Sequence, residues 1–396
     1  MNVVLFTEVM SPYVSGISSY VEVLRKGLSK LGHKVMIVTS SLHVSKTVIK
    51  NGVIRCPAKK SSNKYGYECK NVRDESVMRL LAQFVPDVVH IQTDTRIGYL
   101  GLNAADRFRC PVVFTVHDYY LDRFAGESKP VWQFKTYFEK KHFCDMIDNA
   151  NIITSSNSRA SEFVRDAGRN RRVMLIPNGT DKSRFDYRKC GKEAVAKIRR
   201  RLSLPEDALV ALFAGDLSID KNLEFVLSAF SRKLTRADKI HLLIVGGGTE
   251  LSYLRELCKK LHISDRVHFS GVISHNIMPQ VYSACDVYVC SSDDGLMSMS
   301  FVEAMSCGLP VLVRRDEDGH VDSMITHNVN GFIYKTRNDF AEYLKNVAAL
   351  PDDKKAKMRF IVRNSIENSD AEYMAKNTAN AYRQAMKAFN INIDIH

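Results

Sequence analysis

Short apolar runs alternate with segments of helical periodicity along most of the chain, and this alternation restricts the fold more than any other feature. Near the amino end, the run Val3–Phe6 precedes a segment with apolar residues at helical spacing up to about Leu31, and the run Val35–Val38 follows. A strand–helix–strand unit of this kind joins parallel strands. The same rhythm returns from Val210–Ala214 onward. The sequence therefore predicts two α/β units, each built on a parallel sheet.

The length of the chain and one turn signal predict the domain boundaries. A chain of 396 residues is long enough for two domains with full cores. Pro177-Asn178-Gly179 follows an apolar run, and Pro and Gly together favour a fixed turn there. We expect a first domain over residues 1–176, a linker with one helix over 177–205, and a second domain over 206–373. The last long helix is expected at about 374–396.

The composition is that of a globular protein and excludes several classes. Hydrophobic residues make up 45% and charged residues 26% of the chain, and no run of about 18 apolar residues could cross a membrane. The nine cysteines are scattered without a Cys-x-x-Cys pair, which indicates reduced cytoplasmic thiols and no zinc site. The first strand–helix turn lacks Gly-x-Gly-x-x-Gly, so a nicotinamide or flavin dinucleotide is not expected. We expect no cofactor and no metal.

The positive charge is concentrated in the first half of the chain. The net charge is +13, and residues 1–176 hold 26 Lys and Arg against 16 Asp and Glu, a surplus of 10. The remaining residues therefore have a surplus of only 3. An anionic membrane surface, a phosphorylated acceptor or nucleic acid could complement this charge. No nucleic-acid-binding pattern is present, so nucleic acid is not an expected partner.

The stretch Ser291–Pro310 is the strongest candidate for a ligand site. It follows a short apolar strand and contains a turn at Asp293-Asp294-Gly295. Ser300 and Glu303 have the Ser-x-x-Glu spacing of a capping box, which predicts that a helix begins there. The free N–H groups at its start, near Ser298, Met299 and Ser300, would suit a phosphate or diphosphate.

Glu303-Ala-Met-Ser-Cys-Gly-Leu-Pro-Val resembles the donor-site signature of family 4 retaining glycosyltransferases. Those enzymes have the GT-B fold, in which two Rossmann-like domains face a central cleft and a C-terminal helix returns to the first domain. Pro177-Asn178-Gly179 and Asn330-Gly331-Phe332 are also similar to the family, so the resemblance covers nearly the whole chain. Within the family, Thr115-Val-His117-Asp118 and the basic first half look most like diacylglycerol glucosyltransferases.

The resemblance implies transfer of a sugar, with retained anomeric configuration, from a nucleotide-sugar to a lipid, a lipid-linked or another cell-envelope acceptor. A UDP-sugar is the first choice of donor. His117 would touch the donor sugar, Lys221 would clamp the diphosphate, and Glu303 would hold the ribose. The leaving diphosphate, and no side chain, would take the acceptor's proton. The further donor-binding residues implied are Gly16, Gly215, Asp216, Gly246, Val272, Asp294, Gly295, Ser298, Met299 and Ser300.

Two positions depart from the family pattern. The family has an Arg where this chain has Asp216, and a Glu where it has Gly295, eight positions before Glu303. Asp294 is the candidate substitute for that Glu. These departures leave open a second function, that of a non-catalytic partner subunit that keeps the fold and binds the acceptor or a partner enzyme.

Two basic segments of the first half each have two interpretations. Glu127–Phe143 could be an amphipathic helix lying on an anionic membrane, which would place the protein at the inner face of that membrane, or its aromatic residues could belong to the core. Residues 40–75 have little pattern and could form a mobile basic hairpin near the acceptor or a solvated surface loop. The residues expected at the membrane or acceptor are Lys129, Trp132, Lys135, Lys140 and Lys141.

Overall fold

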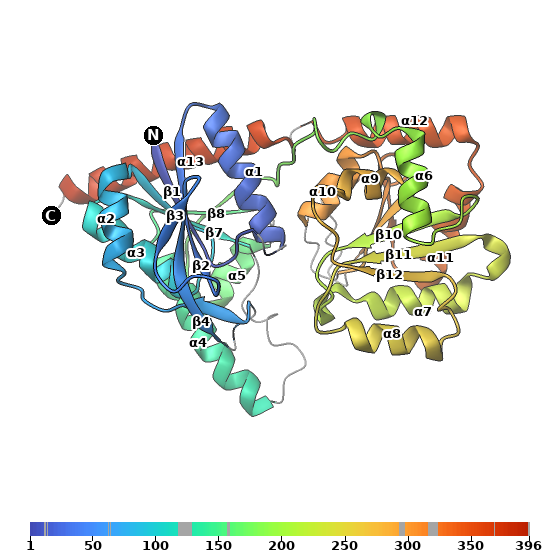
Figure 1. The fold of residues 1–396 in the computed structure, drawn as a ribbon, viewed down its shortest axis with the longest axis horizontal. Helices are drawn as coiled ribbons and strands as arrows, with labels where there is room; N and C mark the ends of the chain where they lie inside the picture. Colours follow the sequence, from blue (N-terminus) through green and yellow to red (C-terminus); the bar gives the residue numbers. More distant parts are fainter. Residues whose placement is uncertain are drawn as a thin grey trace. The chain divides into compact units, whose positions relative to one another are not determined.

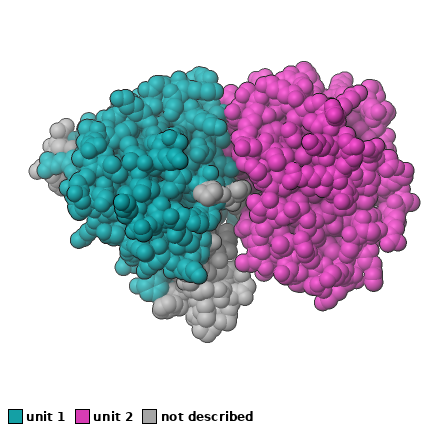
Figure 2. All heavy atoms as spheres, viewed as in Figure 1, with its two compact units in different colours: residues 1–179, 371–396 teal, residues 180–370 magenta. Residues whose placement is uncertain are grey.

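A computed structural model of the chain consists of two compact units. Unit 1 contains residues 1–179 and 371–396, and unit 2 contains residues 180–370 (Figure 2). The structure describes residues 1–11, 13, 15–61, 63, 65–117, 129–156, 159–292, 298–315, 324–367 and 369–394. The side chains of 129–135 and 391–394 are not described.

Unit 1 is built on a nine-stranded sheet in the order β3-β4-β2-β1-β6-β7-β8-β9, with β5 paired to β4. The outer strands β3 and β5 run antiparallel to β4, and the other pairs are parallel. The strands are β1 (Asn2–Thr7), β2 (Lys34–Ser41), β3 (Val48–Lys50), β4 (Val53–Lys60), β5 (Tyr67–Cys69), β6 (Val88–Ile91), β7 (Val112–Val116), β8 (Ile152–Ser155) and β9 (Val173–Leu175).

Helices cover both faces of this sheet. Helices α1 and α13 pack together, and α13 also contacts β7 and β8, while α3 and α4 pack on the other face (Figure 1). Because both faces are covered, Val3, Val4, Leu5 and Phe6 of β1 are all fully buried, which explains the continuous apolar run. The helices are α1 (Gly16–Lys30), α2 (Glu75–Phe84), α3 (Arg96–Phe108), α4 (Lys129–Asn149), α5 (Ala160–Asp166) and α13 (Ala371–Asp394).

The segment 40–75 is more regular than either interpretation of its sequence. It contains β4, which continues the parallel sheet beside β2, and the short strands β3 and β5 that flank it. Pro57 interrupts the strand pattern in the sequence, yet its carbonyl accepts a hydrogen bond from the Lys70 N–H at 3.0 Å. Proline has no N–H, so Pro57 can pair only through its carbonyl, and this made the strand hard to recognise in the sequence.

A buried polar chain fastens the C-terminal helix to the sheet of unit 1. The His90 imidazole contacts the Tyr382 hydroxyl through Nδ1 at 2.7 Å and the Thr115 hydroxyl through Nε2 at 2.6 Å. Thr115 in turn contacts the Thr154 hydroxyl at 2.8 Å. Burial, with a smaller contribution from His117, lowers the pKa of His90 to about 3. The ring is therefore neutral and packs as part of the core.

Unit 2 contains a six-stranded parallel sheet in the order β12-β11-β10-β13-β14-β15. Figure 1 shows α7 and α8 on one face of it and α9 and α10 on the other. The strands are β10 (Leu209–Ala214), β11 (Ile240–Val245), β12 (Val267–Gly271), β13 (Val287–Cys290), β14 (Val311–Arg314) and β15 (Gly331–Tyr334). The helices are α6 (Lys192–Arg201), α7 (Leu223–Lys233), α8 (Leu251–Lys260), α9 (Met278–Ser283), α10 (Met299–Ser306), α11 (Arg337–Ala348) and α12 (Asp352–Asn364).

The segment 177–205, which we expected to be a linker, does not form a separate linker in the structure. From Thr180 onward it belongs to unit 2. Phe185, Ile198 and Leu204 are buried in the core that α9, α10 and α12 share, so the segment is a packed part of that unit. Its many exposed Lys and Arg residues made it look like a linker in the sequence. Across the described ranges, no helix is long and apolar enough to cross a membrane.

Candidate functional site

The sheet of unit 2 has a topological switch point between β10 and β13. From β10 the chain moves to β11 and β12 on one side, and then returns to β13 on the other side. In open parallel sheets, ligands bind in the crevice outside the carboxyl ends of the strands at such a point. Gly215 and Asp216 follow β10 directly, and Ser291 follows β13. The sequence predicted donor-binding residues at these two strand ends.

The loops that follow β10, β11 and β12 pack backbone against backbone. The Leu217 N–H donates to the Gly247 carbonyl at 2.9 Å, and the Gly246 N–H donates to the Gly271 carbonyl at 3.0 Å. Gly246 has a φ of +140°, and a Cβ there would collide with the Gly215 carbonyl, so only glycine fits. The structure thus brings the predicted residues Gly215 and Gly246 together. Val272, 64% exposed, directly follows Gly271 at the edge of this platform.

Lys221 lies at the same end of the sheet and is already paired in the free protein. Its Nζ is 2.6 Å from Asp220 Oδ2, and its carbonyl accepts a hydrogen bond from the Ser291 hydroxyl at 2.6 Å. Burial raises the pKa of Asp220, but the charge of Lys221 and hydrogen bonds from Lys221 and Ser218 outweigh it, so the pKa is lower than usual. A diphosphate bound at Lys221 would therefore have to share the ammonium group with Asp220 or displace that carboxylate. Asp216 is exposed.

The helix that begins near Ser298 does not have the predicted capping box. The N-cap is Ser298, whose hydroxyl oxygen accepts the Phe301 N–H at 3.2 Å, and not Ser300. The prediction was wrong because the Glu303 side chain is engaged elsewhere. Met299 and Ser300 are the first residues of α10, and the first N–H groups of a helix lack intrahelical partners. The predicted residues Asp294 and Gly295 lie outside the described residues.

Glu303 is buried, with 3% of its surface exposed, and two side chains hold its carboxylate. The His275 ring lies 2.7 Å from Oε1 through its Nε2, and the Tyr282 hydroxyl donates to Oε2 at 3.0 Å. Burial, followed by the charge of Glu303, raises the pKa of Tyr282 well above its ordinary value, so the hydroxyl keeps its proton. We call His275 and Tyr282 the Glu303 brace.

Sequence analysis did not find the Glu303 brace. His275 lies in the turn between β12 and α9, so a His in a loop at the carboxyl end of the sheet was the available signal. Tyr282 lies inside the apolar helix α9, where nothing in the sequence distinguishes it from a core residue.

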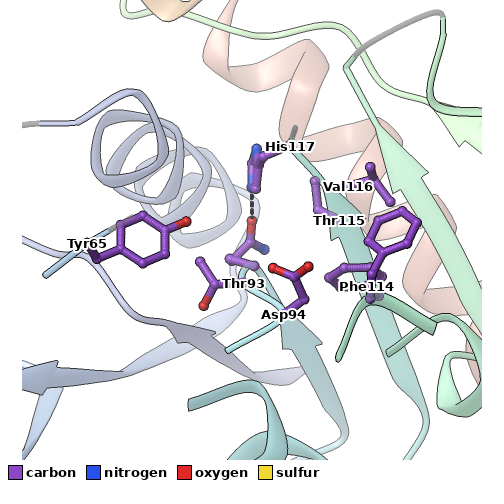
Figure 3. Close-up of a pocket in the computed structure, with 9 residues that line it drawn as sticks. Tyr65, Thr93, Asp94, Phe114, Thr115, Val116 and His117 are labelled. Atoms are coloured by element: carbon purple, nitrogen blue, oxygen red, sulfur yellow. Dashed lines mark hydrogen bonds between the residues drawn. The ribbon is translucent and has the colours of Figure 1, made fainter. Parts of the chain in front are cut away.

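A small pocket lies at the carboxyl ends of β6 and β7 in unit 1 (Figure 3). His117 enters it from the end of β7, and its Nε2 lies 2.9 Å from Gln92 Oε1. The ring of Tyr20 on α1 meets the His117 ring edge-on, with centroids 4.7 Å apart. Thr93 and Asp94 line the pocket beside Gln92, and Tyr65 comes from the segment before β5. The polar run 92–95 directly after a buried strand was the signal that sequence analysis missed.

A buried carboxyl lies at the switch point of unit 1, where β1 is flanked by β2 and β6. Glu8 follows β1, is fully buried, and accepts the Thr95 hydroxyl on Oε2 at 2.6 Å. Burial raises its pKa despite the hydrogen bond from Thr95. Gly16, the first residue of α1, is exposed at this end of the unit, and a side chain placed there would meet nothing within 4 Å of its Cβ.

The described part of α4 has one aromatic side chain in the core and two exposed, so it agrees in part with a core helix and in part with a membrane-binding helix. Phe143 is buried in the core, whereas Tyr137 is 67% and Phe138 is 44% exposed. Lys141 is exposed and Lys140 is partly exposed. Lys129, Trp132 and Lys135 belong to α4, but their side chains are not described.

Family comparisons match both units. A family described as "Glycosyltransferase Family 4" matches residues 14–184, and one described as "Glycosyl transferases group 1" matches residues 195–365. The chain belongs to glycosyltransferase family 4. It is a glycosyltransferase.

Curated relatives of this family 4 glycosyltransferase include two glycolipid synthases. The alpha-monoglucosyldiacylglycerol synthase of Streptococcus pneumoniae is 25% identical over 363 residues, covering 89% of this chain and 79% of the relative. That of Acholeplasma laidlawii is 25% identical over 362 residues, covering 89% of each chain. The predicted likeness to diacylglycerol glucosyltransferases is therefore confirmed at modest identity.

Solved structures of similar fold extend over nearly the whole chain. Sucrose-phosphate synthase from Thermosynechococcus elongatus has a TM-score of 0.77 at 20% identity, covering 98% of this chain and 99% of that one. Anabaena HepE in complex with UDP-glucose has a TM-score of 0.72 at 16% identity, covering 96% and 99%. The predicted fold class, two parallel-sheet α/β domains of GT-B type, is confirmed. The roles of the individual site residues in this family 4 enzyme stay predictions.

No group of three or more His, Cys, Asp or Glu side chains suited to a metal ion occurs among the residues that the structure describes.

Proposed function

We propose that this enzyme transfers a sugar from a nucleotide-sugar, with a UDP-sugar as our first choice, to a lipid or lipid-linked acceptor with retention of anomeric configuration. The observation that carries the proposal is the switch point of unit 2. Lys221, the start of α10 and the braced Glu303 all lie at the carboxyl ends of β10 and β13.

Each of these features has a separate task toward the donor. Lys221 and the first N–H groups of α10 neutralise the diphosphate as it leaves with extra negative charge. Glu303 accepts hydrogen bonds from the ribose hydroxyls. A carboxylate has about four acceptor positions, and His275 and Tyr282 use only two of them. We assign the platform of Gly215, Gly246 and Val272 to the nucleotide base.

Unit 1 supplies groups that orient the reacting partners. We assign to His117 a contact with the transferred sugar. Gln92 and Tyr20 fix the direction of its ring, so that this contact is oriented in advance. Positioning of this kind, together with charge stabilisation, can account for much of a transferase's rate without a protein nucleophile. The diphosphate oxygen of the leaving group takes the acceptor's proton.

A panel of nucleotides and nucleotide-sugars tests the donor assignment. A ligand present at 100 times its Kd stabilises the folded state by about 2.7 kcal/mol, which raises Tm measurably. We expect UDP and one UDP-sugar to raise Tm, and adenosine and guanosine analogues to raise it less. HepE, of similar fold, is solved with UDP-glucose, which supports this order. A panel without any shift would contradict the assignment.

We propose a membrane-embedded acceptor on two grounds. Two relatives are alpha-monoglucosyldiacylglycerol synthases, and the first 176 residues hold most of the positive charge. In this proposal the protein works as a peripheral protein at the cytoplasmic face of an anionic membrane, with α4 as the contact. The exposed rings of Tyr137 and Phe138, next to Lys140 and Lys141, are the described part of that contact.

Vesicle binding tests the acceptor side. Each basic residue near an anionic surface contributes about 1 kcal/mol, screened within a Debye length. Lys140→Ala/Lys141→Ala should therefore weaken binding to anionic vesicles about tenfold or more, while the matched double variant Lys192→Ala/Lys197→Ala on α6 should not. Trp132, the only tryptophan, should shift its emission to the blue on binding. No binding at low salt, with Trp132 emission already blue, would assign α4 to the core.

A further inference from the structure

Unit 2 has a hollow between α7 and the start of α11. Its volume is about 490 Å³, within the range of small-ligand sites. One aromatic ring, Phe225, and four cationic side chains line it: Arg232, Lys233, Lys335 and Arg337. None of the residues that we assign to the donor lines this hollow.

The four cations have no acidic partner within the described ranges. No carboxylate there lies within ion-pair distance of any of them, although several other cations of unit 2 are paired. Asp339, the nearest acidic residue in sequence, instead accepts the backbone N–H groups of Lys335 at 3.1 Å and Thr336 at 2.9 Å. The paired cations of the same unit include Lys221 with Asp220, Arg236 with Asp265, Lys239 with Asp207, and Lys345 with Asp238.

Aromatic contacts hold one of the cations in place. The Arg337 guanidinium lies 5.0 Å from the centroid of the Phe225 ring, and the Arg314 guanidinium lies 4.4 Å from the same centroid. The Tyr334 ring stacks on Phe225 at 5.9 Å. A guanidinium fixed on a ring keeps its N–H groups for a ligand and loses little freedom on binding. Arg337 is therefore pre-organised to bind an anion.

We propose that this hollow, which we call the α7–α11 pocket, binds a phosphate group. Phosphate carries up to two negative charges and several acceptor oxygens, and arginine forks match its geometry. The proposal rests on the four positive charges. It does not rest on the N–H groups at the start of α11, because Thr336 and Asp339 already cap that helix. The phosphate could belong to a free phosphorylated compound or to the headgroup of an acidic phospholipid.

Calorimetry with inorganic phosphate in low-salt buffer tests the proposal for the free ligand. Two double variants remove charge from different helices: Arg232→Gln/Lys233→Gln and Lys335→Ala/Arg337→Gln. Each should raise the Kd for phosphate about tenfold, because two exposed charge contacts are lost. Lys192→Ala/Lys197→Ala removes the same charge outside the pocket and should bind normally. If one pocket variant fails to fold, the other still gives the answer.

A second arm distinguishes the source of the phosphate. It uses vesicles of phosphatidylglycerol and of phosphatidylcholine, with protein that also carries Lys140→Ala/Lys141→Ala so that α4 contributes less. Pocket-dependent binding of inorganic phosphate assigns a free ligand, and pocket-dependent binding of phosphatidylglycerol vesicles alone assigns a headgroup. If the pocket variants match the wild type in both arms, or only Lys221→Ala loses phosphate binding, the proposal is overturned.

Discussion

Replacing Glu303 by Gln removes one negative charge from the proposed ribose contact with almost no change in side-chain size. Glu303 is almost fully buried, and the Glu303 brace fixes both oxygens at 2.7 and 3.0 Å. An amide keeps one acceptor oxygen and adds two donors, so the His275 ring and the Tyr282 hydroxyl can still find partners. The Glu303 carboxylate leaves two charged acceptor positions for the ribose hydroxyls, whereas the amide of Gln leaves one neutral position.

The magnitude of the effect follows from this count. Loss of a charge-assisted hydrogen bond costs about 1–3 kcal/mol of binding free energy, which corresponds to a rise of about 5-fold to 150-fold in the Kd for UDP. Tyr282→Phe provides the complementary test. It removes one donor from the buried carboxylate and should lower the free energy of unfolding by about 1–3 kcal/mol, yet it keeps the charge that binds ribose.

Isothermal titration calorimetry with UDP measures both variants, and thermal unfolding gives their stability. Glu342→Gln, an exposed substitution on α11 of the same unit, is the matched control and should leave both quantities unchanged. If Glu303→Gln binds UDP as tightly as the wild type while losing stability as Tyr282→Phe does, then Glu303 is a structural residue and the ribose assignment is refuted.

Three further predictions concern the other charged groups. Lys221→Ala should weaken UDP binding by about 1.5–3 kcal/mol, whereas Asp220→Asn, which releases Lys221 from its partner, should strengthen UDP binding. If calorimetry gives both variants the UDP affinity of the wild type, Lys221 does not bind the diphosphate. Because burial raises the pKa of Glu8 above 4.5, its contribution to stability falls as pH rises through that value, so Glu8→Gln should gain stability over the wild type as pH increases above about 4.5 in denaturant unfolding. The pKa of His90 falls from 6.5 to about 3, so the stability that its neutral ring provides is complete above pH 6.5 and is lost as pH decreases below that value, by up to about 1.4 kcal/mol per pH unit. His90→Gln should therefore make the free energy of unfolding fall less steeply with decreasing pH below 6.5. Equal slopes for the variant and the wild type would contradict a buried neutral ring.

The parallel sheets could be predicted because fully buried strands leave continuous apolar runs, as Val3–Phe6 and Val210–Ala214 show. Their alternation with helices also places Lys221 and Glu303 at strand ends, which one sequence can indicate. The strand β4 could not be recognised, because Pro57 breaks its pattern and its pairing depends on partners elsewhere in the chain.

The contacts that hold the site residues were beyond the sequence for a related reason. The Glu303 brace joins residues 28 and 21 positions apart, and only the packing of α9 against α10 brings them together. The capping-box prediction for Ser300 and Glu303 was wrong for the same reason, because local spacing cannot show that His275 and Tyr282 already bind the Glu303 carboxylate. In the sequence Glu8 merely follows an apolar run, whereas the fold makes it the buried acid of the unit 1 switch point.

Transfer itself tests the central claim most directly. The protein is incubated with UDP-sugars and with vesicles that contain diacylglycerol and an acidic phospholipid, and the glycolipid formed is analysed by proton NMR at its anomeric centre. We predict a product from one UDP-sugar that has the donor's own anomeric configuration and forms much more slowly with Lys221→Ala. An inverted product, or no transfer from any UDP-sugar that binds, would contradict the proposed retaining transfer to lipid.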